Sequence, residues 1–371
     1  MNYRKREKIF RWISKISFFS LFFLLVFLTR YPLPRAPVNI FFRFNPLAAF
    51  SISISIRKIT PYFIPGLLLV LIFIWVRRKY FCRWACPLGT CFEIWRGIWR
   101  RNKWKKKVSP FPFLSFYIFA FFLGLAIFSL PLIGLLEPFS LLLRAFIHPY
   151  LLLLLLALFM LDLFIPRVWC SRLCPLGGFL TLLNRKRSKK VDFSRRRFIS
   201  SFAGGVILAP LFRLRGENSY LLRPPGAREE REFIAYCIRC GACMKVCLSK
   251  TLHPSLLEGG LEGLWTPHPV FRSAPCQLCF SCGKVCPSGA IKRVNSVSEV
   301  KIGIATINRK RCIAWKREAI CLICMEYCPV QAIWADEKDR PYVGGNVCIG
   351  CGQCENHCPV EGEAAIRVFR I

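Results

Sequence analysis

Histidine and acidic residues are scarce in this sequence. Only 4 of its 371 residues are histidine, and 20 Asp and Glu accompany 55 Lys and Arg. No C-x2-C-H occurs, so a covalently attached c-type haem is excluded. Only His148 lies near a long apolar run, which argues against a b-type haem held by two membrane histidines. No Gly-rich nucleotide loop stands out, and the sequence therefore predicts neither haem nor nucleotide.

The basic excess is confined to the first part of the chain. Residues 1–226 hold 36 Lys and Arg against 6 Asp and Glu, whereas residues 227–371 hold 19 against 14. The first part is also the more apolar one. Basic loops between apolar segments are typical of membrane proteins, whose cytoplasmic loops are rich in Lys and Arg. We therefore expect no nucleic acid partner, despite a net charge of +35.

Four apolar runs predict transmembrane helices, at about 16–29, 61–76, 111–130 and 145–165. The basic head, residues 1–15, could begin a signal peptide, but no small-residue cleavage site follows it. Residues 77–107 carry eleven Lys and Arg, and residues 166–197 carry ten. These two loops and the head are therefore expected on the cytoplasmic side.

Cysteine, in contrast, is abundant, and sixteen of the 21 cysteines form four quartets. Three quartets read C-x2-C-x2-C-x3-C, and the third has eight residues after its first cysteine. The quartets are Cys237, Cys240, Cys243, Cys247; Cys276, Cys279, Cys282, Cys286; Cys312, Cys321, Cys324, Cys328; and Cys348, Cys351, Cys354, Cys358.

This spacing is typical of cubane iron–sulfur clusters. Three thiolates of one loop bind one cluster, and the fourth binds the other cluster of a pair. Zinc ribbons and disulfides are the alternatives, but zinc sites use separated C-x2-C pairs or histidine. The quartets therefore predict four 4Fe–4S clusters. Whether the first quartet pairs with the second or with the fourth stays open.

A second cysteine motif, C-x3-C-P-L-G, occurs twice in the basic part, at Cys82–Cys86 and at Cys170–Cys174. Each motif ends a predicted helical hairpin that opens at Asn45-Pro46 or Glu137-Pro138, which indicates an internal duplication. Four thiolates meeting at one membrane face would form a further iron–sulfur or metal site. Alternatively, the cysteines are structural and Pro-Leu-Gly only ends a helix. Cys91 has no counterpart after Cys174 and is expected to be a plain buried thiol.

The segment Ser194-Arg195-Arg196-Arg197-Phe198-Ile199 precedes a short apolar stretch, residues 202–212. This pattern predicts a twin-arginine export signal, and an ordinary basic flank of a fifth helix is the alternative. Because no clear cleavage site follows, we expect an uncleaved anchor. Pro224-Pro225-Gly226 then predicts a linker. If the stretch instead lay along the membrane surface, the clusters would stay inside the cytoplasm.

Two families are recognisable from these motifs. Residues 1 to about 190, with four spans and paired C-x3-C-P motifs, resemble the NapH-type membrane subunit of quinol dehydrogenases. Residues from about 194 to 371 resemble the NapG/MauM-type ferredoxin, in the twin-arginine leader, the four quartets and Ile302-Gly303-Ile304-Ala305 before Cys312. The chain thus looks like a fusion. The resemblance implies electron transfer from membrane quinol to an extracytoplasmic reductase or cytochrome.

The expected fold is a membrane α-helical domain, four spans plus a signal-anchor helix, followed by an α+β ferredoxin-like domain with the four quartets. The expected boundaries are 1–190 for the membrane domain, 191–226 for the signal-anchor and linker, and 227–371 for the polyferredoxin domain. The protein is expected in a bacterial-type cytoplasmic membrane, with the polyferredoxin domain on the extracytoplasmic side.

Few polar groups at membrane depth could accept protons from a quinol. Asp162 lies within the fourth predicted span, where a lone carboxylate is costly, and Glu137, Arg144 and His148 gather near the other face. Alternatively, Asp162 reaches toward Arg167, and His148 only starts a helix. Rival functions are metal insertion, oxidase maturation and redox sensing. Four complete quartets favour electron transfer, because those functions need fewer clusters.

Overall fold

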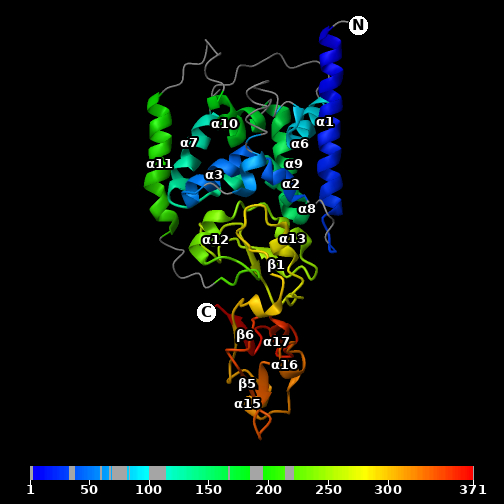
Figure 1. Cartoon of the computed structure of the whole chain (residues 1–371), viewed down its shortest axis with the longest axis vertical. Helices are drawn as coiled ribbons and strands as arrows, with labels where there is room; N and C mark the ends of the chain where they lie inside the picture. Colours follow the sequence, from blue (N-terminus) through cyan, green and yellow to red (C-terminus); the bar gives the residue numbers. More distant parts are fainter. Residues whose placement is uncertain are drawn as a thin grey trace.

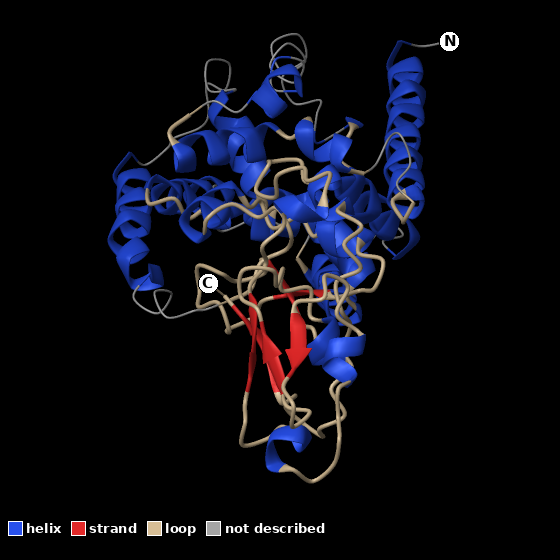
Figure 2. Ribbon diagram, turned by 60° about the horizontal axis from the view of Figure 1, so that its bottom comes forward, coloured by secondary structure: helices blue, strands red, loops and turns tan. Residues whose placement is uncertain are grey.

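The structure, a computed structural model, describes residues 3–32, 38–58, 61–66, 68, 82, 84–99, 114–165, 168–183, 195–213 and 221–370. Figure 1 shows an elongated molecule, with a helical part (residues 3–213) at one end of the long axis and a cysteine-rich part (residues 221–370) at the other. Figure 2 shows that the strands lie in the cysteine-rich part.

Short and medium helices build the helical part. They are α1 (Tyr3–Leu28), α2 (Asn39–Arg43), α3 (Pro46–Ile56), η1 (Pro61–Phe63), α6 (Pro87–Trp99), α7 (Leu114–Ile127), η2 (Leu132–Leu136), α8 (Pro138–Ile147), α9 (Pro149–Phe164), η3 (Trp169–Leu173), α10 (Pro175–Leu183) and α11 (Arg195–Arg213). Proline opens α3, α6, α8, α9 and α10. Its fixed φ suits the first helical position, where no backbone donor is needed.

One helix among the described residues, Arg6–Leu28 within α1, is long and apolar enough to cross a membrane by length and composition. The third and fourth predicted spans are shorter than expected, since α7 has 14 residues and α9 has 16. The fourth run is divided because Pro149 cannot continue α8. Most of the second predicted span lies outside the described residues.

The two X-Pro steps of the predicted duplication have the same structural role and lie in contact. Asn45 accepts hydrogen bonds from the backbone N–H groups of Leu47 and Ala48 and so caps α3. Glu137 caps α8 in the same way, through Phe139 and Ser140. The Asn45 amide nitrogen also donates to Glu137 Oε1 over 2.6 Å. The starts of α3 and α8 therefore meet at one buried hydrogen bond.

Helix α11 packs closely along α7 through glycine. A Cβ atom added to Gly205 would lie 2.1 Å from the carbonyl oxygen of Phe121, and one added to Gly124 would lie 2.4 Å from that of Phe202. Gly204 faces open space. Such small-residue contacts allow close backbone approach between helices. The helix expected at the apolar stretch of residues 202–212 is thus present, within α11, and it belongs to the packed fold.

Short elements make up the cysteine-rich part. They are α12 (Glu230–Tyr236), α13 (Ala242–Val246), β1 (Leu252–Pro254), β2 (Pro267–Pro269), α14 (Ser281–Val285), η5 (Val297–Glu299), β3 (Ile304–Ile307), α15 (Ile313–Lys316), α16 (Ile323–Glu326), β4 (Ile333–Ala335), β5 (Pro341–Val343), α17 (Gln353–Asn356) and β6 (Ile366–Phe369). The strands form three antiparallel pairs, β1–β2, β3–β6 and β4–β5. In the second pair, Ile304 lies opposite Phe369.

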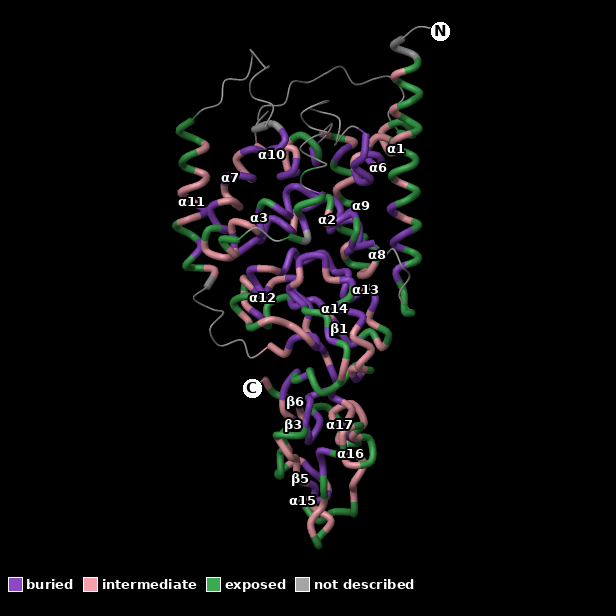
Figure 3. The backbone as a smooth tube through the Cα atoms, viewed as in Figure 1, coloured by how far each residue is buried: buried purple, intermediate pink, exposed green. Residues whose placement is uncertain are grey.

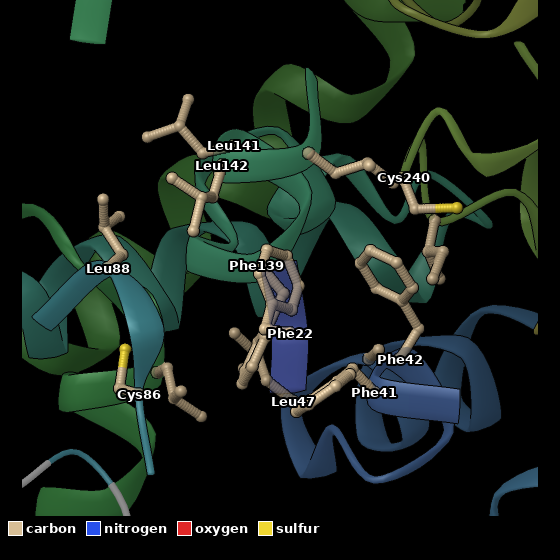
Figure 4. Packing of buried hydrophobic residues seen from close by; sticks show 14 of the residues in the cluster. Phe22, Phe41, Phe42, Leu47, Cys86, Leu88, Phe139, Leu141, Leu142 and Cys240 are labelled. Atoms are coloured by element: carbon tan, nitrogen blue, oxygen red, sulfur yellow. The ribbon is translucent and has the colours of Figure 1, made fainter. Parts of the chain in front are cut away.

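The two parts share one apolar core. Ile238, Cys240 and Val285 of the cysteine-rich part belong to the same buried cluster as Phe139 and Leu142 of the helical part. Figure 4 shows Cys240 among phenylalanines and leucines of the helical part. Figure 3 shows buried residues on both sides of the junction. The helical part therefore holds the cysteine-rich part directly against its end.

The predicted linker at Pro224-Pro225-Gly226 differs from the observed structure. Both prolines are buried, and the preceding Arg223 donates to Glu230 over 3.0 Å and to Thr266 over 2.9 Å. The Gly226 carbonyl also accepts from Lys292 over 2.7 Å. These contacts make residues 221–226 an integral part of the cysteine-rich fold.

Candidate iron–sulfur sites

Backbone geometry explains the C-x2-C-x2-C spacing. In the three regular quartets, the third and fifth loop positions adopt positive φ: Arg239 and Gly241, Leu278 and Phe280, and Gly350 and Gly352. Alternation of right- and left-handed residues turns successive N–H groups inward and creates a concavity that binds anions, as at many iron–sulfur sites. Each loop then continues into a short helix, α13, α14 or α17.

The third and fourth quartets exchange their last cysteines. One cavity of about 300 Å³ is lined by Cys348, Cys351, Cys354 and Cys328. Another cavity, of about 350 Å³, is lined by Cys312, Cys321, Cys324 and Cys358. Each cavity thus combines three cysteines of one loop with the fourth of the other, which is the arrangement of two-cluster ferredoxins.

The first and second quartets exchange in the same way. A cavity of about 430 Å³ is lined by Cys276, Cys279 and Cys282 of the second quartet together with Cys247 of the first. In the reciprocal group, the pKa of Cys243 is raised well above its ordinary value, first by burial and then by the neighbouring thiols Cys240, Cys237 and Cys286. The pairing that the sequence left open is therefore first with second and third with fourth.

The second and fourth quartets adjoin each other between the two pairs. The backbone N–H of Cys276 donates to the carbonyl oxygen of Cys351 over 2.9 Å. Figure 1 places α13 next to the helical part, α16 and α17 further along, and α15 near the far tip. The spatial order of the four groups is thus first, second, fourth and third.

Iron–sulfur clusters fit these cavities. All the cysteines are free, and backbone N–H groups point at their sulfur atoms: Ile291 to Cys286 over 3.5 Å, Ala305 to Cys348 over 3.4 Å, Ala332 to Cys328 over 3.2 Å and Ala365 to Cys358 over 3.3 Å. Hydrogen bonds to sulfur stabilise the negative charge of a cluster and set its potential. Three of these donors belong to Ala-Ile steps that follow the quartets, in which each alanine is buried.

A mononuclear metal centre fits less well. Within the described residues, no group of three or more His, Cys, Asp or Glu side chains is arranged to hold a single metal ion. A structural zinc needs four ligands around one ion, with sulfur atoms about 2.3 Å from it. In a cubane each thiolate binds a different iron, so the four sulfur atoms stand further apart.

The structure also brings the four cysteines of the C-x3-C-P motifs together. The pKa of Cys86 is raised well above its ordinary value, first by burial and then by the neighbouring Cys82, Cys170 and Cys174 thiols. The proline of each motif starts a helix, α6 or α10. A Cβ on Gly89 would lie 3.3 Å from the Cys82 carbonyl oxygen, and one on Gly177 would lie 3.1 Å from that of Cys170. Cys91 lies further along α6 and is half-buried.

The four residues considered for quinol chemistry separate into two places. Asp162 is buried and forms an ion pair with Arg96 of α6 over 2.8 Å. Arg167, its predicted partner, lies outside the described residues. Glu137 is buried at the start of α8, and Arg144 is buried within α8. Arg144 donates to the Gly134 and Leu135 carbonyls over 2.7 and 2.9 Å. His148 follows at the junction of α8 and α9.

Sequence reasoning missed two residues that join the first quartet to its surroundings. Arg239, within the first cysteine loop, is 1% exposed and donates to the carbonyls of Leu264 over 2.9 Å and Glu262 over 2.7 Å. The second residue, Trp265, directly follows Leu264, so the hydrogen bonds of Arg239 hold the Trp265 segment beside the first cysteine loop. The sequence shows only that Arg239 stands between two predicted cluster cysteines, Cys237 and Cys240. The carbonyl groups that Arg239 binds are distant in sequence, so its connecting role could not be predicted.

Taken together, the cysteine cavities and the ferredoxin-like loops define an iron–sulfur electron-transfer protein. A family model described as a 4Fe–4S binding domain matches residues 59–107 and 147–194. Each matched segment contains one C-x3-C-P motif, so the same model finds both halves of the duplication.

Curated relatives match about half of the chain. The ferredoxin-type protein MauM of methylamine utilization, from Methylorubrum extorquens, is 37% identical over 185 residues, covering 46% of this chain and 82% of the relative. The ferredoxin-type protein NapG of Escherichia coli is 34% identical over 207 residues, covering 49% and 88%. No solved structure matches. The chain therefore belongs to the family of ferredoxin-type proteins that includes MauM and NapG.

Proposed function

We propose that this chain carries electrons from membrane quinol to a reductase or cytochrome outside the cytoplasm, using one cluster in each of the four cysteine groups. The order of the cavities along the molecule is the observation that carries the proposal. The first group lies against the helical part, and the third lies furthest from it (Figure 1). A row of redox centres between a membrane domain and an exposed tip suits electron transfer, and the NapG and MauM relatives support it.

The proposed membrane architecture is a NapH-type domain of four spans, joined to the ferredoxin part by α11. The double family match and the meeting of the two capped half-helices at Asn45 and Glu137 support this duplication. Figure 1 shows the starts of α1 and α11 at the same end of the molecule, opposite the cysteine-rich part. This arrangement favours α11 as the crossing that follows Arg195 and Arg196.

The four C-x3-C-P thiols are proposed to hold a further iron–sulfur cluster. Iron analysis of the anaerobically purified full chain should give about sixteen irons from four cubanes and about twenty if the motifs hold a fifth. In the latter case, replacing both Cys86 and Cys174 by Ser should lower the count by about four. Stoichiometric zinc with little iron would refute the cluster assignment.

Anaerobic mixing of the purified full chain with a short-chain quinol tests the proposed function. The expected result is bleaching of the cluster absorbance to a level close to that reached with dithionite. Clusters that dithionite reduces but no quinol reduces would contradict quinol as the donor. A metal-insertion factor or sensor would show no sustained electron flow from quinol to an added acceptor.

A further inference from the structure

Aromatic and basic side chains from both parts of the molecule gather beside the first quartet. The His148 ring lies 5.7 Å from the Trp265 ring in an edge-on arrangement, and Tyr150 lies 5.9 Å from Trp265. The Arg144 guanidinium lies 5.6 Å from the Trp265 ring. His253 lies on β1, and the Trp265 backbone N–H donates to the carbonyl oxygen of Ser255, just after β1, over 2.7 Å. We call His148, Tyr150, Trp265, Arg144 and His253 the junction cluster.

Three ring nitrogens of the junction cluster find no hydrogen-bond partner among the described residues. His148 Nε2, His253 Nε2 and Trp265 Nε1 are buried atoms that accept or donate no hydrogen bond within this part of the chain. Trp265 as a whole is 6% exposed. Buried polar groups are paired in nearly all proteins, and an unpaired one costs about 1–3 kcal/mol. These three nitrogens come from the α8–α9 junction and from the β1–β2 hairpin, and a ligand with hydroxyl or carbonyl groups would complete their hydrogen bonding.

The junction cluster is connected directly to the first quartet. Arg239, between Cys237 and Cys240, binds the two carbonyls that precede Trp265 and so fixes the Trp265 loop to the cysteine loop. On the other side, a Cβ on Gly241 would lie 3.4 Å from Arg144 Cγ. A molecule held at the junction cluster therefore lies next to the cysteine loop of the first quartet, which is nearest the helical part.

An apolar surface reaches the same place. Tyr150 is 45% exposed at the start of α9, and the leucines that follow it, Leu152, Leu153, Leu154 and Leu156, are exposed as well. An exposed row of leucines on a helix of a membrane domain is suited to contact with lipid. A lipid-soluble ring compound could thus reach the junction cluster from the bilayer without crossing the protein.

We propose that the junction cluster is the site at which quinol binds and is oxidised; this inference rests on the proposed function. The quinol ring lies against the exposed side of Tyr150, at the edge of the contacting His148, Tyr150 and Trp265 rings. Its two hydroxyl groups donate to His148 Nε2 and His253 Nε2, and Trp265 Nε1 donates to one of the quinol oxygens. On oxidation the two O–H bonds break and quinone forms. The protons pass to His148 and His253, and the two electrons leave one at a time toward the first quartet. The protons are then released on the side of the cysteine-rich part.

Steady-state reduction by quinol provides the first test, with dithionite reduction as a check that the clusters are assembled. His148→Gln and His253→Gln should each lower kcat/KM for quinol by about 100-fold, the lower end of general-base effects. Trp265→Phe should raise the KM by about 2- to 10-fold through one lost hydrogen bond. Trp334→Phe, an exposed tryptophan on β4, is the matched control and should behave as wild type.

A photoreactive azidoquinone gives a readout that does not depend on turnover. After illumination, label is expected on peptides that contain residues 148–150 or 253–268, and His148→Gln should reduce it. Label near the C-x3-C-P motifs, or full quinol activity in the histidine variants, would overturn the junction site while leaving quinol as the donor. A wild-type chain that no quinol reduces would instead refute the proposed function itself.

Discussion

The guanidinium of Arg239 donates a hydrogen bond of 2.9 Å to the carbonyl oxygen of Pro131, across 108 residues of sequence. Pro131 precedes η2 in the helical part, and Arg239 lies between two cysteines of the first quartet. The same side chain also binds the Leu264 and Glu262 carbonyls. One buried side chain therefore connects the helical part, the first cysteine loop and the Trp265 loop.

Arg239→Ala should destabilise the junction by about 3 kcal/mol, because hydrogen bonds to a charged donor contribute about 1.5–3 kcal/mol each and several carbonyls lose their partner. Arg239→Lys should recover little of this, since an ammonium lacks the planar fork. The measurement is the midpoint of thermal loss of cluster absorbance. Arg293→Ala, at an exposed position, is the control, and equal midpoints for both alanine variants would contradict the role.

Ligand exchange predicts that the last cysteine of each distal quartet affects the other quartet's cluster. Cys358→Ser should alter the cluster bound by Cys312, Cys321 and Cys324, and Cys328→Ser should alter the cluster bound by the fourth loop. Electron paramagnetic resonance of the reduced protein would identify which signal changes in each variant. A change in the variant's own loop cluster would show that no exchange occurs.

Gly205→Leu should separate α11 from α7, because its Cβ would lie 2.1 Å from a backbone carbonyl oxygen. Forced overpacking of this kind costs about 1–3 kcal/mol or more. Gly204→Leu is a matched control at the neighbouring position, where no atom of the described residues lies within 4 Å. The expected readout is rapid proteolysis around residues 195–226 in the first variant only. Equal proteolysis of both variants would refute the close contact.

The Asn45–Glu137 hydrogen bond can be tested by exchange of partners. Asn45→Asp places two carboxylates together in a buried site, where like charges repel, and should lower the thermal midpoint. Adding Glu137→Gln gives the pair one amide donor and one carboxylate acceptor again. This second change should recover most of the loss in thermal midpoint. A double-mutant cycle measures this coupling. Additive effects of the two changes would mean that the residues do not interact.

Topology is tested with a reporter enzyme that is active only outside the cytoplasm, fused after Ile371. The proposed crossing at α11 predicts reporter activity, and replacing Arg195 and Arg196 by Lys should abolish it, as expected for a twin-arginine signal. The same fusion made in a strain lacking that export route serves as control. Activity that never appears with the native arginine pair would place the cysteine-rich part in the cytoplasm.

Local spacing in the sequence indicates which cysteines of one loop lie together, because such a loop is built from consecutive residues. Cys276, Cys279 and Cys282 line one cavity, for example, while their role as cluster ligands stays a prediction. The pairing of quartets could not be predicted, because the fourth ligand comes from a distant loop. The Ala-Ile step was visible in the sequence, but its role as a donor to sulfur, as from Ala332 to Cys328, depends on the folded geometry.

Proline and glycine predicted the ends of helices and the positions of linkers less reliably than the cysteine spacing predicted loops. Pro149 ends α8 as expected of a proline, and the fourth predicted span is shorter for that reason. At residues 224–226 the same residue types suggested a linker, yet Arg223 and Gly226 fix this segment to the second half of the first ferredoxin pair. Composition alone cannot distinguish a free connection from an extended segment whose hydrogen bonds come from elsewhere in the fold.

The exchange of ligands between quartets also determines when a cluster can be inserted during synthesis of the chain. The outermost cavity begins with Cys312 but is completed only by Cys358, and the group of Cys237, Cys240 and Cys243 gains Cys286 only from the second quartet. A ribosome that has produced one loop has therefore produced no complete site. Cofactor insertion must wait until both members of a pair have emerged and folded together, so a chain truncated between Cys328 and Cys348 would lose both distal clusters.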